Sequence, residues 1–246
     1  MTTEKETLIC DIHGPYSLQA FGGRRCPTCD EEHWKEQERQ RAAEDALARL
    51  KAARIPILFR GKLLNDFEAD TPAQQKVLRV AKEYVDRFSE HLTCGRGLIM
   101  LGNVGTGKTM LSCAIAQAVN TEHSHDRPFL ALYATASEII RTVRDTWGSR
   151  EENTTDAITR FVTPNLLIID EIGANVGTDS ERALLFEVID LRYGATRPTI
   201  AVTNCDPSGL TAVLGERAVD RLRDHDADVC VFDWESKRRW KGVNGL

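Results

Sequence analysis

From residue 55 onward, the hydrophobic positions of the chain alternate between two patterns. Five short apolar runs predict buried strands, at 98–101, 129–134, 166–170, 199–203 and 229–232. Between these runs, apolar residues recur every three or four positions, which predicts amphipathic helices. One such helix is expected to be capped by Asp179 or Ser180 and to have its apolar face at Ala183, Leu184, Val188 and Leu191. Continuous apolar strands alternating with helices indicate an α/β fold, with a five-stranded parallel sheet covered by helices on both faces.

The first 54 residues lack this alternation of apolar runs and amphipathic helices. Residues 1–33 are rich in Gly, Cys and turn formers, whereas Glu, Gln, Arg, Lys and Ala dominate from Trp34 to Arg54. A thin apolar stripe recurs at helical spacing in this second segment, at Ala43, Ala46, Leu47, Leu50 and Ala53. We therefore expect a small module at 1–33, a charged linker helix at 34–54 and the α/β domain at 55–246. The linker helix fits a spacer and a docking face for a partner equally well.

Composition restricts the class of protein. The 246 residues suffice for one α/β domain and a small appendage, and 41% hydrophobic with 28% charged residues is typical of a soluble globular protein. No apolar run approaches the ~20 residues of a membrane-spanning helix, and the polar N-terminus does not resemble a signal peptide. We therefore expect a cytoplasmic protein without a membrane partner. The net charge of −5 argues against coating of duplex DNA by bulk charge but leaves room for local basic patches.

A glycine-rich loop lies between the first predicted strand and the helix that follows it. Its residues fit the pattern G-x-x-x-x-G-K-[ST]: Gly102, Asn103, Val104, Gly105, Thr106, Gly107, Lys108 and Thr109. Such glycines let backbone N–H groups surround a phosphate, and the helix N-terminus adds partial positive charge. Lys108 is expected to neutralise the β- and γ-phosphates, and Thr109 to offer its hydroxyl to Mg²⁺. The loop therefore predicts binding of Mg²⁺ and a nucleoside triphosphate, which we expect to be ATP.

Polar residues follow two of the predicted strands. The strand 166–170 ends in Asp170 and Glu171, an unfavourable arrangement unless a cation lies at the tip of the strand. We expect Asp170 to hold Mg²⁺ and Glu171 to act as the general base that polarises the attacking water. The alternative is that the two acids cap the following turn. Asn204 follows the strand 199–203 and is expected either to orient the attacking water or to form the turn before Asp206.

Two ligand pairs near the N-terminus have the spacing of metal ligands. Cys10-x-x-His13 and Cys26-x-x-Cys29 can each form a tight knuckle, and two knuckles give a tetrahedral Cys₃His zinc site. The module has turn formers but no large core, as in small folds that a metal stabilises. His33 is the second choice for the histidine ligand, and thiols unrelated to metal are the alternative. Because four protein ligands leave no open position, we expect the zinc to be structural.

Taken together, residues 55–240 resemble the DnaC-type replicative helicase loaders, a branch of the AAA+ type of P-loop ATPases. The glycine loop and the acid pair occur in many ATPases, whereas Gly-Glu-Arg-x-x-Asp-Arg at 215–221 and Trp-Glu-Ser at 234–236 are far more particular. The resemblance implies that Asn204 is a first sensor, Arg238 a second sensor, and Arg217 an arginine finger that reaches the nucleotide of a neighbouring subunit. Such a finger implies self-association through the nucleotide sites. The alternative for Arg217 is a solvated helix face with opposite charges at helical spacing.

The resemblance also implies a function, in which an ATP-hydrolysing loader helps to place a hexameric helicase of the DnaB type on single-stranded DNA during DNA replication. In this family the helix around 139–147 lines the DNA path, and the candidate phosphate contacts here are Arg141, Arg144 and Arg150. Trp147 could stack on a base, but it shares a helical face with Ile140 and Val143, so we expect it in the core.

The ends of the chain add two further expectations. The few residues that follow Phe232 are too short for the full helical lid of AAA+ proteins. The housekeeping bacterial loader lacks the Cys₃His quartet, so this sequence looks more like the loaders of phages and prophages, and the zinc module with its linker helix is expected to recruit the helicase. Two other functions stay open: an IstB-like ATPase that directs a transposase to target DNA, and a zinc-bearing DNA-binding regulator with a vestigial ATPase.

Overall fold

The computed structural model describes residues 7–17, 26–121, 123–124, 127–148, 153–174 and 176–237. The chain divides into two compact units between Ala48 and Arg49. Within the described residues, no helix is both long enough and apolar enough to cross a membrane. The domain boundaries expected from the sequence, after residues 33 and 54, stay predictions.

The N-terminal unit contains a hairpin and most of a long helix. Strands β1 (Thr7–Cys10) and β2 (Gly14–Ser17) pair antiparallel. Helix α1 (Pro27–Ala52) begins at Pro27 rather than at Trp34, because proline suits the first turn of a helix and Asp30 complements the helix dipole there. Residues 31–45 of α1 are all exposed. Of the predicted apolar stripe, Ala43 and Leu47 are exposed, Leu50 is half-buried and Ala53 is completely buried.

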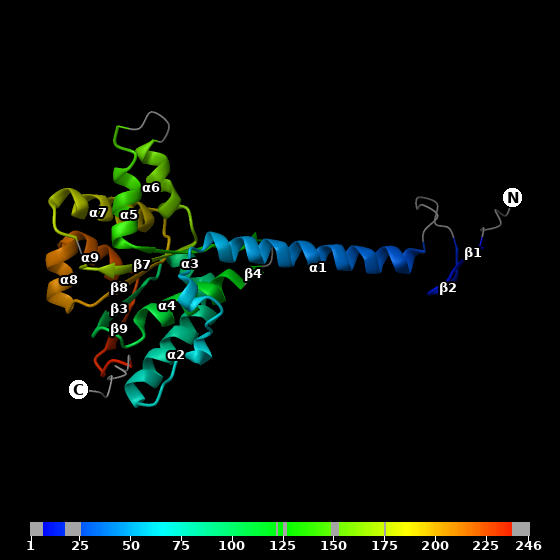
Figure 1. Ribbon diagram of the computed structural model, residues 1–246, viewed down its shortest axis with the longest axis horizontal. Coiled ribbons are helices and arrows are strands. Elements are labelled where there is room, and N and C mark those ends of the chain that lie inside the picture. Colours follow the sequence, from blue (N-terminus) through cyan, green and yellow to red (C-terminus); the bar gives the residue numbers. More distant parts are fainter. Residues whose placement is uncertain are drawn as a thin grey trace, which may run out of the picture. The chain divides into compact units, whose positions relative to one another are not determined.

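The C-terminal unit is built on a parallel sheet of five strands in the order β6-β7-β8-β3-β9 (Figure 1). Its strands coincide with the five predicted runs: β3 (Leu98–Gly102), β6 (Ala131–Thr135), β7 (Leu166–Ile172), β8 (Thr199–Thr203) and β9 (Asp228–Phe232). All neighbouring pairs in this sheet are parallel. The C-terminal ends of the strands therefore share one edge, which is where parallel α/β sheets bind ligands.

Helices cover both faces of this sheet, as the sequence predicts. One face packs against α2 (Pro72–Asp86), α3 (Phe88–Cys94) and α4 (Lys108–Thr121), and the other against α5 (Ala136–Arg144), α6 (Thr154–Val162), α7 (Asp179–Gly194), α8 (Pro207–Leu214) and α9 (Glu216–Arg223). Successive residues of one strand serve opposite cores, so that Met100 packs on the first face and Ile99 on the second. The remaining elements are the 3₁₀ turns η1 (Ile57–Phe59) and η2 (Leu64–Asp66) and the short antiparallel pair β4 (His123–Ser124) and β5 (Arg127–Pro128).

Capping residues set the starts of two helices. At α5, the Glu138 backbone N–H donates to Thr135 Oγ1 at 3.1 Å, and the Thr135 N–H donates to the Glu138 carboxylate at 2.9 Å, which is a complete capping box. At α7 the expected cap was wrong by one position or more. Thr178 is the N-cap there, because only Thr178 has a glutamate, Glu181, three residues later to complete the box.

A buried arginine near the end of α7 departs from the hydrophobic pattern. Leu191, predicted to face the core, is 46% exposed, whereas Arg192 is completely buried. The Arg192 guanidinium donates to the backbone carbonyls of Phe161, Val162, Pro164 and Pro198 and to Thr199 Oγ1. Burial lowers the pKa of Arg192 to about 9. The arginine thus ties together the segments that lead into β7 and β8.

Candidate nucleotide site and metal centre

The glycine-rich loop joins the end of β3 to the start of α4. Gly102, Gly105 and Gly107 have positive φ angles of 132°, 78° and 100°. A Cβ atom on Gly102 would collide with the carbonyl group of Phe232, and one on Gly107 would lie 2.9 Å from the Phe67 ring. Glycine is therefore required at both positions by the close approach of neighbours as well as by the backbone angle.

The side chain of Lys108 is bonded to the loop itself. The residue is only 6% exposed. Its ammonium group donates to the carbonyl oxygens of Gly102 at 2.8 Å and Asn103 at 2.5 Å. Burial lowers the pKa of Lys108, and the charge of Asp170 opposes that shift. The Lys108 ammonium group is largely shielded from solvent and bonded to neutral carbonyl oxygens. An anion beside it would therefore be strongly favoured.

Asp170 is buried at the end of β7 and accepts two hydrogen bonds. The Tyr133 hydroxyl donates to Asp170 Oδ2 at 2.9 Å, and the Glu171 backbone N–H donates to Oδ1 at 2.7 Å. Burial and the Asp170 charge both raise the pKa of Tyr133, so the hydroxyl keeps its proton and remains a donor. Tyr133 was not among the site residues expected from the sequence, although its hydroxyl group within the apolar run 129–134 was a signal that could have identified it.

Glu171 occupies a strained backbone position beside Asp170. Its φ angle is +57°, in the left-handed region, and the β7–β8 pairing shifts register between Ile169 and Ile172. Such a bulge re-aims a side chain, and strain of this kind is found at functional sites. The Glu171 side chain accordingly lies at the pocket instead of continuing the alternation of the strand.

A pocket of about 340 Å³ brings the predicted residues of the nucleotide site together. Its polar lining contains Gly105, Gly107, Lys108, Thr109, Asp170, Glu171, Asn204 and Lys237, and its apolar lining contains Leu58, Phe59, Val104 and Met110. Gly102, Asn103 and Thr106 belong to the same loop but do not line the pocket. A hydroxyl and a carboxylate, from Thr109 and Asp170, supply the oxygen ligands that Mg²⁺ prefers. The apolar side, which the sequence analysis did not anticipate, suits the flat ring of a base.

The two predicted sensor residues, Asn204 and Arg238, and the predicted arginine finger, Arg217, differ in where they lie. Asn204 lines the pocket, and the neighbouring Asp206 forms the turn by capping α8 through the Gly209 N–H. Arg217 is exposed on α9, does not line the pocket, and has no ionic or hydrogen-bond partner among the described residues. Arg221 pairs with Asp190 of α7 at 3.1 Å, which is a contact between two helices and not the same-helix ion-pair face of the alternative. Arg238 lies outside the described residues.

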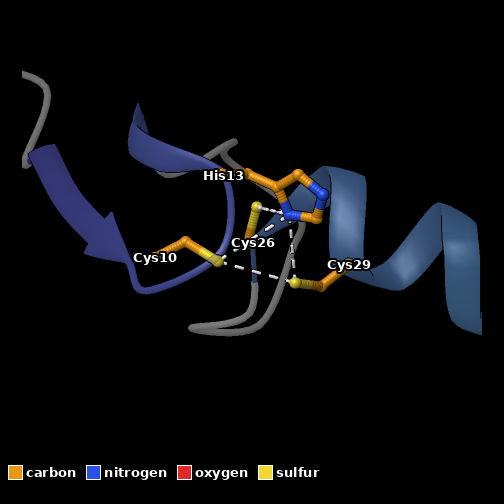
Figure 2. Close-up of side chains that lie close together, drawn as sticks. All are labelled: Cys10, His13, Cys26 and Cys29. Atoms are coloured by element: carbon orange, nitrogen blue, oxygen red, sulfur yellow. Dashed lines mark hydrogen bonds between the residues drawn. The ribbon is translucent and has the colours of Figure 1, made fainter.

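The four predicted zinc ligands converge in the N-terminal unit, as Figure 2 shows. His13 Nδ1 lies 3.8 Å from the Cys10 sulfur, 3.9 Å from that of Cys26 and 3.4 Å from that of Cys29, and the sulfurs of Cys10 and Cys29 are 3.5 Å apart. A tetrahedron with Zn–S bonds of about 2.3 Å and a Zn–N bond of about 2.0 Å has edges of roughly 3.5–3.8 Å. The donor set and its spacing therefore fit zinc.

Neighbouring groups favour metal binding at two of the four ligands, Cys10 and His13. The backbone N–H groups of His13 and Ile12 lower the pKa of the Cys10 thiol, as expected for a knuckle that carries a thiolate. The other ring nitrogen of His13, Nε2, lies 3.3 Å from the Glu32 carboxylate. A carboxylate in this place orients a metal-bound imidazole. His33, the second choice, is on an exposed part of α1 beside Gln37.

A groove of about 630 Å³ lies beside α5. Trp147, which was expected in the core, lies at this groove. Ile140 and Val143 are in the core, but Trp147 is 54% exposed and lines the groove with Arg141 and Arg144. The expectation of a buried Trp147 was wrong because α5 ends at Arg144, so the helical spacing does not continue to residue 147. Arg150 lies outside the described residues.

Comparisons with known proteins agree with this geometry. A profile of the family described as IstB-like ATP binding protein matches residues 29–241. The replicative helicase loader DnaC of Buchnera aphidicola subsp. Acyrthosiphon pisum is 25% identical over 217 residues, covering 84% of this chain and 85% of that protein. DnaC of Escherichia coli strain K12 is 28% identical over 173 residues, covering 70% of this chain and 67% of that protein. A crystal structure of the DnaC helicase loader matches the fold with a TM-score of 0.63 at 20% identity, covering 72% of this chain and all of that one.

Proposed function

The chain belongs to the family of IstB-like ATP-binding proteins, and on this premise we propose that it is an ATP-dependent loader of a replicative helicase. It would help to place a hexameric helicase of the DnaB type on single-stranded DNA during DNA replication. The observation that carries the proposal is the likeness to proteins named replicative helicase loader, which extends over 84% of the chain and thus well beyond the nucleotide pocket. The alternative, an IstB-like ATPase that directs a transposase, would belong to the same family, but the relatives named as helicase loaders favour the loader.

ATP hydrolysis is assigned to the pocket at the end of β3. The loop and Lys108 bind the phosphates. Thr109 and Asp170 would hold Mg²⁺, which would supply positive charge to stabilise the transferred phosphoryl group. Glu171 accepts a proton from the attacking water, and Asn204 orients that water. Both carboxylates line the pocket, but Glu171 is exposed whereas Asp170 is only 3% exposed, and this difference supports the division of roles.

Arg217 is proposed to act on the nucleotide of a neighbouring copy. It lies outside the pocket of its own subunit and has no partner among the described residues, so its guanidinium is available to another molecule. Placing the finger on a neighbour couples hydrolysis to self-association. Arg238 keeps the role of a second sensor as part of the same proposal.

Single-stranded DNA is assigned to the groove beside α5. Trp147 offers an exposed ring on which a base can stack, at roughly 1–3 kcal/mol per base. Arg141 is exposed and has no ionic partner in the described part of the chain, whereas Arg144 pairs with Glu181 at 2.9 Å. A spectroscopic titration with a single-stranded oligonucleotide should show weaker binding for Trp147→Ala than for the wild type.

The N-terminal unit is proposed to recruit the helicase. The Cys₃His cluster would hold structural zinc. Helix α1, which is exposed along residues 31–45, would serve either as a spacer or as a docking face for the helicase. In this proposal the parts are 1–33, 34–54 and 55–246, and the protein works in the cytoplasm, in the manner of the zinc-bearing loaders of phages and prophages. The apolar side chains of Ile9, Ile12 and Trp34 are exposed in this unit and are proposed as contacts for the protein partner.

Co-purification with the host's DnaB-type helicase tests the proposal. The tagged full-length chain should retain the hexameric helicase, and the amount retained should change when ATP is replaced by ADP. Cys26→Ser should reduce retention, while Lys108→Ala should retain helicase without any response to nucleotide. Capture of a transposase in place of the helicase would favour the alternative function. Absence of both partners, together with ATP turnover that single-stranded DNA does not alter, would favour the DNA-binding regulator.

A further inference from the structure

The segment that follows β9 is bonded to the phosphate-binding loop. The Trp234 indole N–H donates to the Thr106 carbonyl oxygen at 3.1 Å, and the Lys237 backbone N–H donates to the Gly105 carbonyl oxygen at 2.9 Å. Residues 233–237, which we call the strap, therefore hold two consecutive carbonyl groups of the loop. The bond from the Asn103 N–H to the Phe232 carbonyl, at 3.0 Å, extends the β3–β9 pairing into the start of the loop.

Aromatic side chains anchor one end of the strap. The Trp234 ring lies 4.9 Å from Phe232 and 6.4 Å from Phe67, measured between ring centroids. Phe67 is also the ring that leaves no room for a Cβ atom at Gly107. The cluster of Phe67, Phe232 and Trp234 thus packs against both the strap and the loop.

An ion pair anchors the other end of the strap. The Lys237 ammonium group donates to the Glu68 carbonyl oxygen at 2.6 Å and to the carboxylates of Glu68 and Asp70, each at 3.2 Å. The two carboxylate side chains are about three-quarters exposed, so solvent screens these pairs and each contributes little. The aromatic anchor and the backbone bonds therefore dominate.

Because the peptide bond is planar, the contacts of the loop carbonyls also determine the direction of the loop N–H groups. In a trans peptide the carbonyl oxygen and the following N–H point in opposite directions, and none of the described peptide bonds is cis. Carbonyls of Gly105 and Thr106 that face the strap therefore direct the N–H groups of Thr106 and Gly107 away from it. Neither N–H donates to an acceptor within the described part of the chain. Adjacent free N–H groups of this kind form a nest for an anion.

We propose that the strap holds the phosphate-binding loop in its anion-binding conformation before nucleotide arrives, with Trp234 and Lys237 as positioning residues. The proposal rests on the nucleotide binding assigned above to this pocket. Because coupling is reciprocal, a nucleotide in the loop also stabilises the strap.

Trp234→Phe tests the proposal because it keeps an aromatic ring in the cluster and removes only the indole N–H and part of the ring. One neutral hydrogen bond corresponds to roughly a five-fold change in an equilibrium constant, so the Kd for Mg²⁺–ADP should rise about five-fold by calorimetry. Tyr84→Phe is the matched control, since the Tyr84 hydroxyl also donates to a backbone carbonyl, that of Arg96 at 3.0 Å, but far from the pocket lining. It should lower the melting temperature without changing the Kd.

The ATPase reaction provides a second measurement. A misplaced loop weakens binding of substrate and transition state alike, so Trp234→Phe should raise KM about five-fold with kcat nearly unchanged. An unchanged KM and Kd in Trp234→Phe, or an equal change in Tyr84→Phe, would overturn the proposal. Failure of the wild-type chain to bind ADP would instead refute the nucleotide site itself.

Discussion

The close contact between Gly107 and Phe67 allows one substitution to be worked through in detail. Gly107→Ala introduces a Cβ atom where the backbone has φ +100° and where the Phe67 ring would lie 2.9 Å away. Ordinary carbon–carbon contacts are about 3.5–4.0 Å, so either the ring or the loop must move. Phe67 is only 6% exposed and is enclosed by Phe232 and Trp234, so it cannot swing into solvent.

The expected loss of stability has two parts. The left-handed backbone costs an alanine roughly 1–2 kcal/mol, and overpacking of a buried ring costs roughly 1–3 kcal/mol. Gly107→Ala should therefore lower the free energy of unfolding by about 3 kcal/mol. Gly61→Ala measures the first part alone, because Gly61 has φ +76° and nothing lies within 4 Å of its added Cβ atom.

Urea unfolding of the nucleotide-free proteins separates the two parts. Gly107→Ala should lower the urea concentration at the unfolding midpoint clearly more than Gly61→Ala. It should also weaken ADP binding at least ten-fold, about 1.4 kcal/mol, because the loop is displaced. In the double variant Gly107→Ala with Phe67→Leu, the loss should be smaller than the sum of the single losses by about 1 kcal/mol. Equal destabilisation by the two alanine variants, or strict additivity in the double variant, would show that the Phe67 contact does not constrain the loop.

Four further predictions follow from the site and the fold. Lys108→Ala should abolish the heat of ADP binding in calorimetry, since it removes the ammonium group at the loop; normal binding would refute the site. Arg217→Ala should bind ATP normally but lose most hydrolysis, and mixing it with Glu171→Gln subunits should restore part of the activity in a phosphate-release assay; no restoration would argue against a shared site. Metal analysis should find one zinc per chain, and Cys26→Ser should lose most of it, whereas zinc retained by this variant would exclude the Cys₃His site. Arg192→Met should lower the free energy of unfolding by about 3–5 kcal/mol, because it leaves buried carbonyl groups without donors; a loss below about 1 kcal/mol would contradict this role.

The strands, the phosphate-binding loop and the zinc quartet were all predictable because their signals are local. A buried parallel strand needs a continuous apolar run, and each of the five runs became a strand of the sheet. A phosphate-binding loop needs its glycines and lysine at fixed spacing, since neighbouring backbone N–H groups do the binding. Two knuckles likewise carry their ligands within a few residues of one another.

Contacts between distant segments could not be predicted in this way. Tyr133 reaches Asp170, and Trp234 reaches Thr106, only because the parallel sheet brings the ends of separate strands to one edge. The sequence of each strand contains no information about which neighbour it will have. Trp147 was misplaced for a related reason: its burial depended on where α5 ends, and a helix boundary depends on contacts made elsewhere.

The contrast is clearest at the end of α7, where periodicity placed Leu191 inside and the fold placed Arg192 there instead. Local sequence by itself determined two things: hydrophobic spacing fixed the main strands and helices and their order, and the glycines and lysine fixed the chemistry of the phosphate-binding loop. Both depend on residues close together in the chain. Only the tertiary structure decided which backbone carbonyls would converge on one guanidinium group, and which segment would lie against the phosphate-binding loop. The physical reason is that hydrogen bonds and close packing depend on distance in space. Residues at almost any separation along the chain can be brought to such distances by the fold.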